Sequence, residues 1–330
     1  MSFECIITFF AIPLFNRIKW MIKTFHSSAF LSKPQLLQAK KQRGIRISVV
    51  IPALNEAKTI GTIVSRIHQK MVEEVAIIDE IVVMDGLSND STVKEAIKAG
   101  ASVYTLDSAG PTVCSSGKGV ALWKSQFVTT GDILVFIDSD IIDFDERFIC
   151  GLLGPLLICQ EFDFVKAFYK RPLLLGSGVY ENQGGRVTEI LVRPLLSAFI
   201  PDLACFNQPL AGEYAIRRSL LETLPVFSGY GVEIGLLMDI YFSQGLSRVA
   251  QVDMEKRWHR NRTVAELSKM SFALLNVMIN RMQKYGLVSL KSFSEYLIVA
   301  EGLSYSKEEC EESELSPKNN FSQECTYGSC

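Results

Sequence analysis

The sequence has no excess of basic residues. Its 34 Lys and Arg stand against 36 Asp and Glu, the formal net charge is −2 and the pI is about 6.0. A nucleic-acid-binding surface needs a concentration of positive charge, and the chain contains none of the usual DNA- or RNA-binding motifs. We therefore expect no nucleic-acid partner, whereas local basic residues remain suited to an anionic small molecule.

The chain also lacks a long hydrophobic run. The apolar stretch at residues 5–15 is too short to span a bilayer as a helix. Its positive residues, Arg17 and Lys19, follow the apolar run, whereas a signal peptide places them before it. We expect no transmembrane segment, a cytoplasmic protein, and an arm at residues 1–43 that packs on the body.

Paired cysteines are missing too. None of the cysteine spacings matches a zinc site or a redox pair, and a chain of this size and class does not need a disulfide framework. The prediction is a reduced protein whose cysteines pack as small apolar residues. The eight are Cys5, Cys114, Cys150, Cys159, Cys205, Cys310, Cys325 and Cys330.

What the chain does contain, from Gly44 onward, is an alternation of strand-like and helix-like patterns. Short apolar runs predict strands at residues 47–51, 81–84, 101–105 and 133–137, and helical spacing fills the intervals between them. This β-α-β-α order predicts an α/β fold with a mostly parallel sheet covered by helices. Residues 44–145 make up this regular half of the chain.

The second half of the chain, residues 146–302, is less regular. Strands are expected at residues 164–169, 211–216 and 248–252, and helices at 188–199 and 232–244. Thr263 and Glu266 form a capping-box pattern ahead of a long helix. From about residue 303 the chain is polar, acidic and rich in serine, so residues 303–330 are expected to be a disordered tail.

The strongest chemical signal lies where the predicted strands end. Ligands of parallel α/β sheets gather at the carboxyl ends of the strands. Asp138-Ser139-Asp140 follows an apolar strand directly, and Glu56 and Asp85 follow two others. Carboxylate oxygens at such positions suit Mg²⁺ or Mn²⁺, which complete their shells with phosphates and water. The alternative reading of Asp138-Ser139-Asp140 is an ordinary turn.

Two glycine-rich signatures are absent. Pro52-Ala53-Leu54-Asn55-Glu56 occupies the position of a Rossmann glycine fingerprint but contains no glycine, so it indicates binding of a base and ribose rather than of a dinucleotide. Ser116-Gly117-Lys118-Gly119 is not a Walker A loop, yet its lysine and flexible backbone suit a nucleotide or its phosphates. A helix cap and a surface turn are the respective alternatives.

Two further features point to anion and metal binding. Gly184-Gly185-Arg186-Val187-Thr188 is a glycine-rich turn leading into a predicted helix, which is an arrangement suited to a phosphate or carboxylate. His259 stands among arginines, and a neutral imidazole can complete a divalent metal shell. A plain helix start explains Thr188 equally well, and from the residues alone a surface or packing histidine is the favoured interpretation of His259.

The ordered set of motifs resembles the retaining glucosyl-3-phosphoglycerate synthases, which have the GT-A glycosyltransferase fold. The resemblance covers about residues 47–270. It rests on the segments I-S-V-V-I-P-A-L-N-E, G-K-G-V-A-L-W-K-S, F-I-D-S-D, G-G-R-V-T-E, Q-P-L-A-G-E-Y-A, G-Y-G-V-E-I-G-L-L and H-R-N-R. It implies one GT-A domain over residues 44–302, with a Rossmann-like nucleotide-binding half and an acceptor-binding half.

The resemblance also implies roles for individual residues. The nucleotide-sugar would be held by Pro52, Ala53, Leu54, Glu56, Gly86, Lys118, Asp138 and Ser139. The metal would be bound by Asp140 and His259, and the acceptor by Gly185, Arg186, Thr188 and Asn261. Glu233 would contact the donor glucose, and Leu210 would present its backbone carbonyl near the reacting carbon.

One position departs from the family pattern. Residues 85–88 read Asp-Gly-Leu-Ser where the family usually has D-S-G-S, so Gly86 replaces a serine and only its backbone remains to serve the nucleotide. The implied reaction is glucosyl transfer from an NDP-glucose, with UDP-glucose expected, to 3-phosphoglycerate, assisted by Mg²⁺ or Mn²⁺. The family also suggests a homodimer.

Other activities remain open at this point. A mannose donor or an unphosphorylated glycerate acceptor would need only a few changed pocket contacts. A sugar nucleotidyltransferase would share the α/β start and the metal, but it expects a glycine-rich signature with a basic residue after the first strand. A transferase that acts on a lipid carrier would usually have a membrane helix. A non-catalytic relative would be expected to have lost some of the residues Asp138, Asp140, Arg186 and His259.

Overall fold

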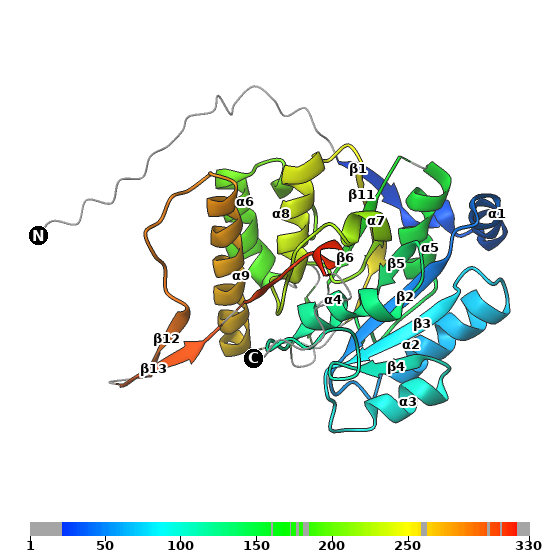
Figure 1. The fold of residues 1–330 in the computed structure, drawn as a ribbon, viewed down its shortest axis with the longest axis horizontal. Helices are drawn as coiled ribbons and strands as arrows, with labels where there is room; N and C mark the ends of the chain where they lie inside the picture. Colours follow the sequence, from blue (N-terminus) through cyan, green and yellow to red (C-terminus); the bar gives the residue numbers. More distant parts are fainter. Residues whose placement is uncertain are drawn as a thin grey trace, which may run out of the picture.

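The protein is built around one eight-stranded sheet (Figure 1). The computed structural model describes residues 22–321, apart from residues 160, 172, 176–177, 181–184, 259–262, 302–303 and 311. Across the sheet the strands are β1 (Lys23–His26), β11 (Val249–Lys256), β6 (Phe164–Lys170), β9 (Tyr214–Arg217), β5 (Ile133–Phe136), β2 (Ile47–Ala53), β3 (Glu80–Asp85) and β4 (Ser102–Thr105).

Most neighbouring strands of this sheet are parallel. Only β9 runs against its neighbours β5 and β6. The prediction of an α/β fold with a mostly parallel sheet is confirmed. Strand β2 continues through Pro52, which lies beyond the last residue paired with β5, and a missing N–H is best tolerated at such a place.

Helices cover both faces of the sheet, as the alternation of the strand patterns requires. Along β2, Val49 and Ile51 pack on the face covered by α2 and α5, whereas Val50 packs on the opposite face with residues of α4, α8 and α9. The helices are α1 (Lys33–Arg43), α2 (Ile60–Ile67), α3 (Thr92–Lys98), α4 (Lys118–Val128), α5 (Arg147–Gly154), α6 (Arg193–Phe199), α7 (Arg218–Leu221), α8 (Val232–Gln244) and α9 (Val264–Lys284).

Several helices are extended by tighter or wider turns. The π-helical turns are η3 (His68–Glu73), η4 (Pro155–Cys159) and η5 (Thr188–Val192), and the 3-10 turns are η2 (Ser27–Phe30), η6 (Leu203–Cys205) and η7 (Lys318–Asn320). Pro194 lies in the first turn of α6, where no intrahelical N–H is needed. The predicted capping box of Thr263 and Glu266 is present at the start of α9.

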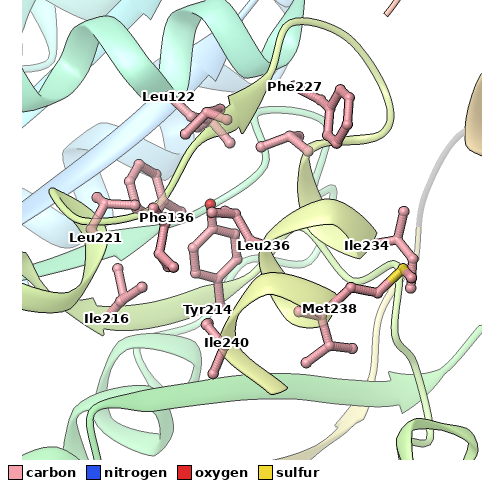
Figure 2. Packing of buried hydrophobic residues seen from close by; sticks show 14 of the residues in the cluster. Leu122, Phe136, Tyr214, Ile216, Leu221, Phe227, Ile234, Leu236, Met238 and Ile240 are labelled. Atoms are coloured by element: carbon pink, nitrogen blue, oxygen red, sulfur yellow. The ribbon is translucent and has the colours of Figure 1, made fainter. Parts of the chain in front are cut away.

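The core between the sheet and α8 is tightly packed (Figure 2). Tyr214 of β9 lies with its ring 4.8 Å from that of Phe136 on β5, beside Leu236 and Ile240 of α8. These side chains are buried almost completely. This packing fixes α8 against the sheet and thereby sets the position of its first turn.

The N-terminal arm is more closely integrated than the sequence suggested. The described residues of the expected arm, 22–43, include β1, which joins the edge of the sheet and pairs in parallel with β11 from Lys23–Ala250 to His26–Asp253. The segment is short and largely exposed, so it lacks the apolar pattern by which a strand is recognised. Its pairing partner lies more than 220 residues further along the chain.

The expectation of a disordered tail is corrected for residues 304–310 and 312–321. Strand β14 (Glu314–Leu315) pairs with β10 (Val226–Phe227), and Leu315 is buried. Phe321 packs edge-on against Trp123 at 5.3 Å. A few apolar anchors in a polar stretch were enough to order it. Two further hairpins are formed by β12 (Tyr296–Glu301) with β13 (Ser304–Glu309), and by β7 (Leu173–Leu175) with β8 (Gly178–Tyr180).

Among the described residues, no helix combines the length and the apolar character that crossing a membrane requires. The longest, α9, spans 21 residues and has charged and polar side chains along its length.

Candidate active site

The carboxyl ends of the parallel strands converge at one edge of the sheet. Because β9 is antiparallel to both β5 and β6, those two strands point the same way, and β9 begins where they end. This topology brings together the residues that follow β5 and β11, the end of β6 and the residue before β9. They are Asp138, Asp140, Arg257, Tyr169 and Glu213.

Arg257 stands at the centre of this group. Its Nη1 lies 3.2 Å from Asp138 Oδ2 and 2.6 Å from Glu213 Oε1, and its Nη2 lies 2.5 Å from Asp140 Oδ1. Nη1 also donates to the Tyr169 hydroxyl at 2.6 Å. Only 2% of Arg257 is exposed. The planar guanidinium presents a rigid fork of N–H donors, which here reaches three carboxylates and a hydroxyl at once.

Lys118 forms a second link in the same group. It is the first residue of α4, and its Nζ lies 2.6 Å from Asp138 Oδ1 and 2.7 Å from Glu233 Oε1. Glu233 comes from the first turn of α8 and is buried. Gly212 leaves room for the pair, since a Cβ there would overlap Asp138 and lie 2.5 Å from Lys118 Nζ.

The buried charges of the site compensate one another. Burial alone would raise the pKa of Asp138, but Lys118 and Arg257 hold it well below its usual range. Burial alone would lower the pKa of Lys118, but Asp138 and Glu233 raise it well above its usual value. For Glu213 burial outweighs Arg257 and raises the pKa. Asp138 and Lys118 therefore form a firmly ionised pair at the strand edge.

The turns after β2 and β3 lie side by side. The Gly86 N–H donates to the Ala53 carbonyl at 2.8 Å, and Leu54 has 56% of its surface exposed. Asp85, which the sequence grouped with the chemical candidates, is buried, and its Oδ2 accepts from the N–H groups of Leu87 and Ser88. Asp85 thus shapes this turn, while Leu54 and Gly86 line its open side.

The remaining nucleotide candidates lie on the neighbouring turns. The Glu56 N–H donates to Thr92 Oγ1 at 2.8 Å, which ties the start of the α2 region to α3. The Ser139 carbonyl accepts from Thr59 Oγ1 at 2.6 Å, which ties the turn after β5 to the turn after β2. Pro52 is the last residue but one of β2, just before the turn that follows the strand. The predicted nucleotide residues are therefore held on one continuous set of turns.

Leu210 lies in a turn that is held by hydrogen bonds of the next residue, Ala211. The Ala211 N–H donates to the Gln208 carbonyl at 3.1 Å, and the Ala211 carbonyl accepts from Lys166 Nζ at 2.7 Å. Burial lowers the pKa of Lys166 to about 8. Since Gly212 touches Asp138 and Lys118, this turn places Leu210 close to the same ion pairs.

The acceptor candidates belong to a different element. Gly185, with φ of +79°, and Arg186 lead into η5, where Thr188 is buried. His259 and Asn261, which the sequence proposed for the metal and the acceptor, lie outside the described residues. The ion pairs given above bring together Lys118, Asp138, Asp140 and Glu233; they do not include the η5 residues.

The chemistry of Asp140 fits a hard divalent cation. Its side chain is 34% exposed against 20% for Asp138, so it is the more open carboxylate of the pair. Within the described ranges, which leave out residues 259–262, no group of three or more His, Cys, Asp or Glu side chains could hold a metal alone. An ion here would depend on oxygen atoms from a bound diphosphate, as Mg²⁺ sites commonly do.

Several residues of the site were not identified as site residues from the sequence. Arg257 was noted only as one of the arginines near His259 and as a possible source of positive charge, and Glu213, Tyr169 and Lys166 were not singled out. Glu213 lies inside the segment Q-P-L-A-G-E-Y-A, and Arg257 lies two residues before H-R-N-R, so these segments were the available signal. Tyr169 and Lys166 belong to a strand whose place in the sheet is set by β9 and β11, which the one-dimensional pattern does not reveal.

Known proteins resemble this chain closely. The glycosyl transferase family 2 model matches residues 48–157. Glucosyl-3-phosphoglycerate synthase of Petrotoga mobilis is 44% identical over 82% of this chain and 83% of its own length. That of Mycolicibacterium smegmatis is 47% identical over 74% of this chain and 80% of its own length.

Solved structures agree with these relatives. A crystal structure of the Mycobacterium tuberculosis glucosyl-3-phosphoglycerate synthase, in complex with Mn²⁺, UDP-glucose and phosphoglyceric acid, matches with a TM-score of 0.80 and 38% identity. The match covers 91% of this chain and 98% of that one, and another structure of the same enzyme contains Mg²⁺ and UDP. The GT-A fold expected from the motifs is confirmed. The chain therefore belongs to the glucosyl-3-phosphoglycerate synthases, a family of hexosyltransferases.

Proposed function

We propose that this protein transfers glucose from UDP-glucose to 3-phosphoglycerate with retention of configuration, giving glucosyl-3-phosphoglycerate. The observation that carries the proposal is the ion-paired group of Lys118, Asp138, Arg257 and Asp140 at the carboxyl edge of the sheet. Such an arrangement suits a diphosphate and a divalent ion together.

The donor would lie across the turns after β2, β3 and β5. Pro52, Ala53, Leu54, Glu56 and Gly86 would hold the base and ribose, in part through backbone groups. Lys118, Asp138 and Ser139 would follow along the nucleotide, and Glu233 would contact the glucose. Glu233 is well suited to that role because α8 holds it rigidly at 2.7 Å from Lys118.

Asp140 and His259 would hold Mg²⁺ or Mn²⁺. When bound, the ion supplies Lewis-acid stabilisation of the negative charge that grows on the leaving diphosphate. The buried Arg257 and the partly buried Lys118 both pair with Asp138, and they add preorganised positive charge without any rearrangement. Both are fixed by several carboxylates, which keeps them in place as the bond breaks.

The acceptor is a small anion that must be oriented rather than activated strongly. Gly185, Arg186 and Thr188 lie at the start of a helical segment, and Asn261 would join them from the chain after β11. Backbone N–H groups and a guanidinium there suit the phosphate and carboxylate of 3-phosphoglycerate. Orientation of the acceptor hydroxyl beside the anomeric carbon supplies much of the rate increase.

We favour attack on the same face as the departing phosphate. The Leu210 carbonyl would stabilise positive charge on the anomeric carbon, and a leaving-phosphate oxygen would accept the acceptor proton. Glu233 is the only carboxylate assigned to the sugar here, and its pairing with Lys118 makes it a weak nucleophile.

An end-point assay tests the function directly. Purified protein, Mg²⁺, UDP-glucose and 3-phosphoglycerate should release UDP, and release should require both the acceptor and Asp140. Glycerate, GDP-mannose and Asp140→Ala serve as comparisons. Efficient release with glycerate or with GDP-mannose would keep the metal-dependent transferase but replace the substrate assignment. No release with any pair, by a folded protein that binds nucleotide, would refute catalysis.

The cellular setting and the oligomer belong to the same proposal. Both substrates are cytoplasmic metabolites, so we place the enzyme in the cytoplasm. A homodimer is supported by the β12–β13 hairpin, which projects from the body beyond α9 (Figure 1). An isolated hairpin is marginally stable, yet this one exposes Ile298 and Tyr305. Light scattering should show a dimer, and Ile298→Asp should shift it toward monomer; a monomeric wild type would refute the dimer.

A further inference from the structure

The C-terminal strap, which we define as residues 312–321, touches both helices that carry the donor-side ion pair. Its strand β14 pairs with β10, which lies just before α8. The Ser228 N–H donates to the Ser313 carbonyl at 2.9 Å, and the Ser313 N–H donates to Ser228 Oγ at 3.0 Å. The strap therefore runs beside the segment from which α8 starts.

Glu312 caps α8 from outside that helix. Its Oε2 accepts from the Gly229 N–H at 2.8 Å and its Oε1 accepts from the Gly231 N–H at 3.1 Å. Gly231 is the N-cap of α8 and has no side chain with which to cap it. The N–H of an N-cap residue has no intrahelical acceptor, and it is the group that the glutamate of a capping box binds. A carboxylate there also matches the positive end of the helix dipole.

The glycines around Glu312 make this contact possible. A Cβ on Gly229 would lie 2.5 Å from Glu312 Oε1, and a Cβ on Gly231 would overlap Val277 of α9. Side chains at these positions would displace the carboxylate or the helix start. The close approach of the Glu312 carboxylate to the backbone therefore requires glycine at both residue 229 and residue 231.

The other side of the same segment rests on α4. The Val120 N–H donates to the Ser228 carbonyl at 3.0 Å, and a Cβ on Gly119 would overlap the Phe227 carbonyl. The strap also reaches α4 directly, since Trp123 Nε1 donates to the Ser316 carbonyl at 2.8 Å. Residues 227–231 are therefore held between the start of α4, which carries Lys118, and the strap.

We propose that Glu312 is a positioning residue of the donor site, which holds the first turn of α8 so that Glu233 meets Lys118 and the donor sugar. This inference rests on the proposed function, because Glu233 and Lys118 are assigned to the donor there. Glu312 itself acts through the helix turn and has no contact with the reacting atoms in this scheme. The strap thereby links the C-terminal part of the chain to catalysis.

The first test compares Glu312→Ala with Glu314→Gln in the full-length protein. Glu314 lies on the same strap but pairs with Arg281, so its variant loosens the strap without touching the α8 cap. Glu312→Ala should lower kcat for UDP-glucose about tenfold to a hundredfold, as a misplaced contact group does. The KM for 3-phosphoglycerate should not change, and Glu314→Gln should leave both constants near wild type. Equal kinetic losses in the two variants would overturn the proposal.

The decisive test is a double-mutant cycle. If Glu312 acts through Glu233, Glu312→Ala should have little further effect on kcat in a Glu233→Gln background. Gly229→Ala should imitate Glu312→Ala, and Glu312→Gln, which keeps one acceptor oxygen, should recover part of the loss. Additive effects of Glu312→Ala and Glu233→Gln would mean that Glu312 merely stabilises the fold, and would refute the positioning role.

A measurement without substrate separates this inference from the proposed function. Amide hydrogen exchange over residues 229–236 should be faster in Glu312→Ala than in wild type, and unchanged in Glu314→Gln. Unchanged exchange in Glu312→Ala would refute the capping role even if the enzyme proves active. Faster exchange in a protein that fails to use UDP-glucose would uphold the cap and refute the substrate assignment alone.

Discussion

Arg257 and Arg281 are both buried arginines, but they belong to clusters of different kinds. Arg257 is 2% exposed and Arg281 is fully buried. Each lies over an aromatic ring, with Arg257 5.3 Å from the centre of Tyr169 and Arg281 4.2 Å from that of Phe227. By burial and by partner type alone, the two would be difficult to tell apart.

Their surroundings separate them. Arg281 joins α9 to Asp239 on α8 at 2.8 Å and to Glu314 of the C-terminal strap at 2.5 Å, and Tyr285 donates to Asp239 at 2.6 Å. That cluster ties three elements together. Arg257 instead meets Asp138 and other carboxylates at the strand edge where a ligand would bind. The place of a buried charge in the fold, rather than its burial, indicates function.

The largest expected effect comes from breaking the Arg281 cluster. Arg281→Met removes the buried cation of the Asp239 carboxylate and leaves it only the exposed Lys284, whose Nζ lies 3.8 Å from Asp239 Oδ1, so the free energy of unfolding should fall by about 3–5 kcal/mol. Chemical denaturation measures this loss. The control is Arg281→Met combined with Asp239→Leu, which removes both charges and should recover most of the stability. A loss below about 1 kcal/mol in the single variant would contradict the buried-pair interpretation.

A substitution in the Arg257 cluster should lower the enzymatic activity rather than the stability. Arg257→Lys keeps the charge but cannot meet Asp138, Asp140 and Glu213 together, so kcat should fall about a hundredfold, as when one preorganised donor is lost. Steady-state kinetics at saturating donor and acceptor measure it. Arg281→Lys is the matched control: it should lower the unfolding free energy while the folded protein keeps its kcat. The reverse pattern would mean that the two roles are exchanged.

Lys166 is a third buried cation, but unlike the two arginines it donates to a backbone carbonyl, that of Ala211, rather than to a carboxylate. Burial lowers its pKa from an ordinary value of 10.5 to about 8. Between these values the unfolded chain holds a proton that the folded protein has lost, so stability rises with pH. Relative to Lys166→Met, wild type should gain about 1.4 kcal/mol per pH unit across this window.

Denaturation of both proteins from pH 7 to pH 10 measures that difference. Below pH 8 folded and unfolded chains both carry the proton, so the burial cost is present in full and the difference should be flat. A difference that stays flat up to pH 10 would show that the folded protein does not hold Lys166 with a lowered pKa.

The smallest effect is expected where the strap meets α4. Trp123→Phe removes the hydrogen bond from Nε1 to the Ser316 carbonyl and leaves a small cavity, because Trp123 is fully buried. The free energy of unfolding should fall by about 2 kcal/mol, roughly half from each cause. Ser316 is exposed, so water can replace the lost donor. Thermal unfolding measures the change. A loss comparable with that of Arg281→Met would mean that the fold depends on Trp123 as much as on the Arg281 ion pairs, and would contradict this ranking.

Local patterns predicted the regular part of the fold well. The strands β2, β3, β4 and β5 were all located from apolar runs bounded by turns, and the capping box of Thr263 and Glu266 was found from two residues. Each of these signals acts over a few neighbouring residues, which is the range on which a one-dimensional pattern carries information. Local patterns did not predict strand β1 or the strap, because both are stabilised by partners that are distant in the sequence.

The residues of the candidate site likewise divide into those that a local sequence signal identified and those that it did not. Asp138 and Asp140 were recognised by their position after a strand, and Lys118 by its glycines. The turn with Gly185, Arg186 and Thr188 was noted from its residues as an anion site, whereas the acceptor role of these three and the roles of Glu233 and Leu210 came from family motifs. All of these assignments stay predictions. Lys166 and Tyr169 carried no local signal, because their importance depends on which strands lie beside β6.

The sequence by itself determined the α/β class, the strand ends that carry the chemistry and the family, because each depends on short segments read in order. The tertiary structure alone decided that Arg257 joins Asp138, Asp140 and Glu213, and that Glu312 caps the helix of Glu233. These contacts span about 40 to 120 residues of chain, and buried charges are stable only where folding supplies all their partners at once.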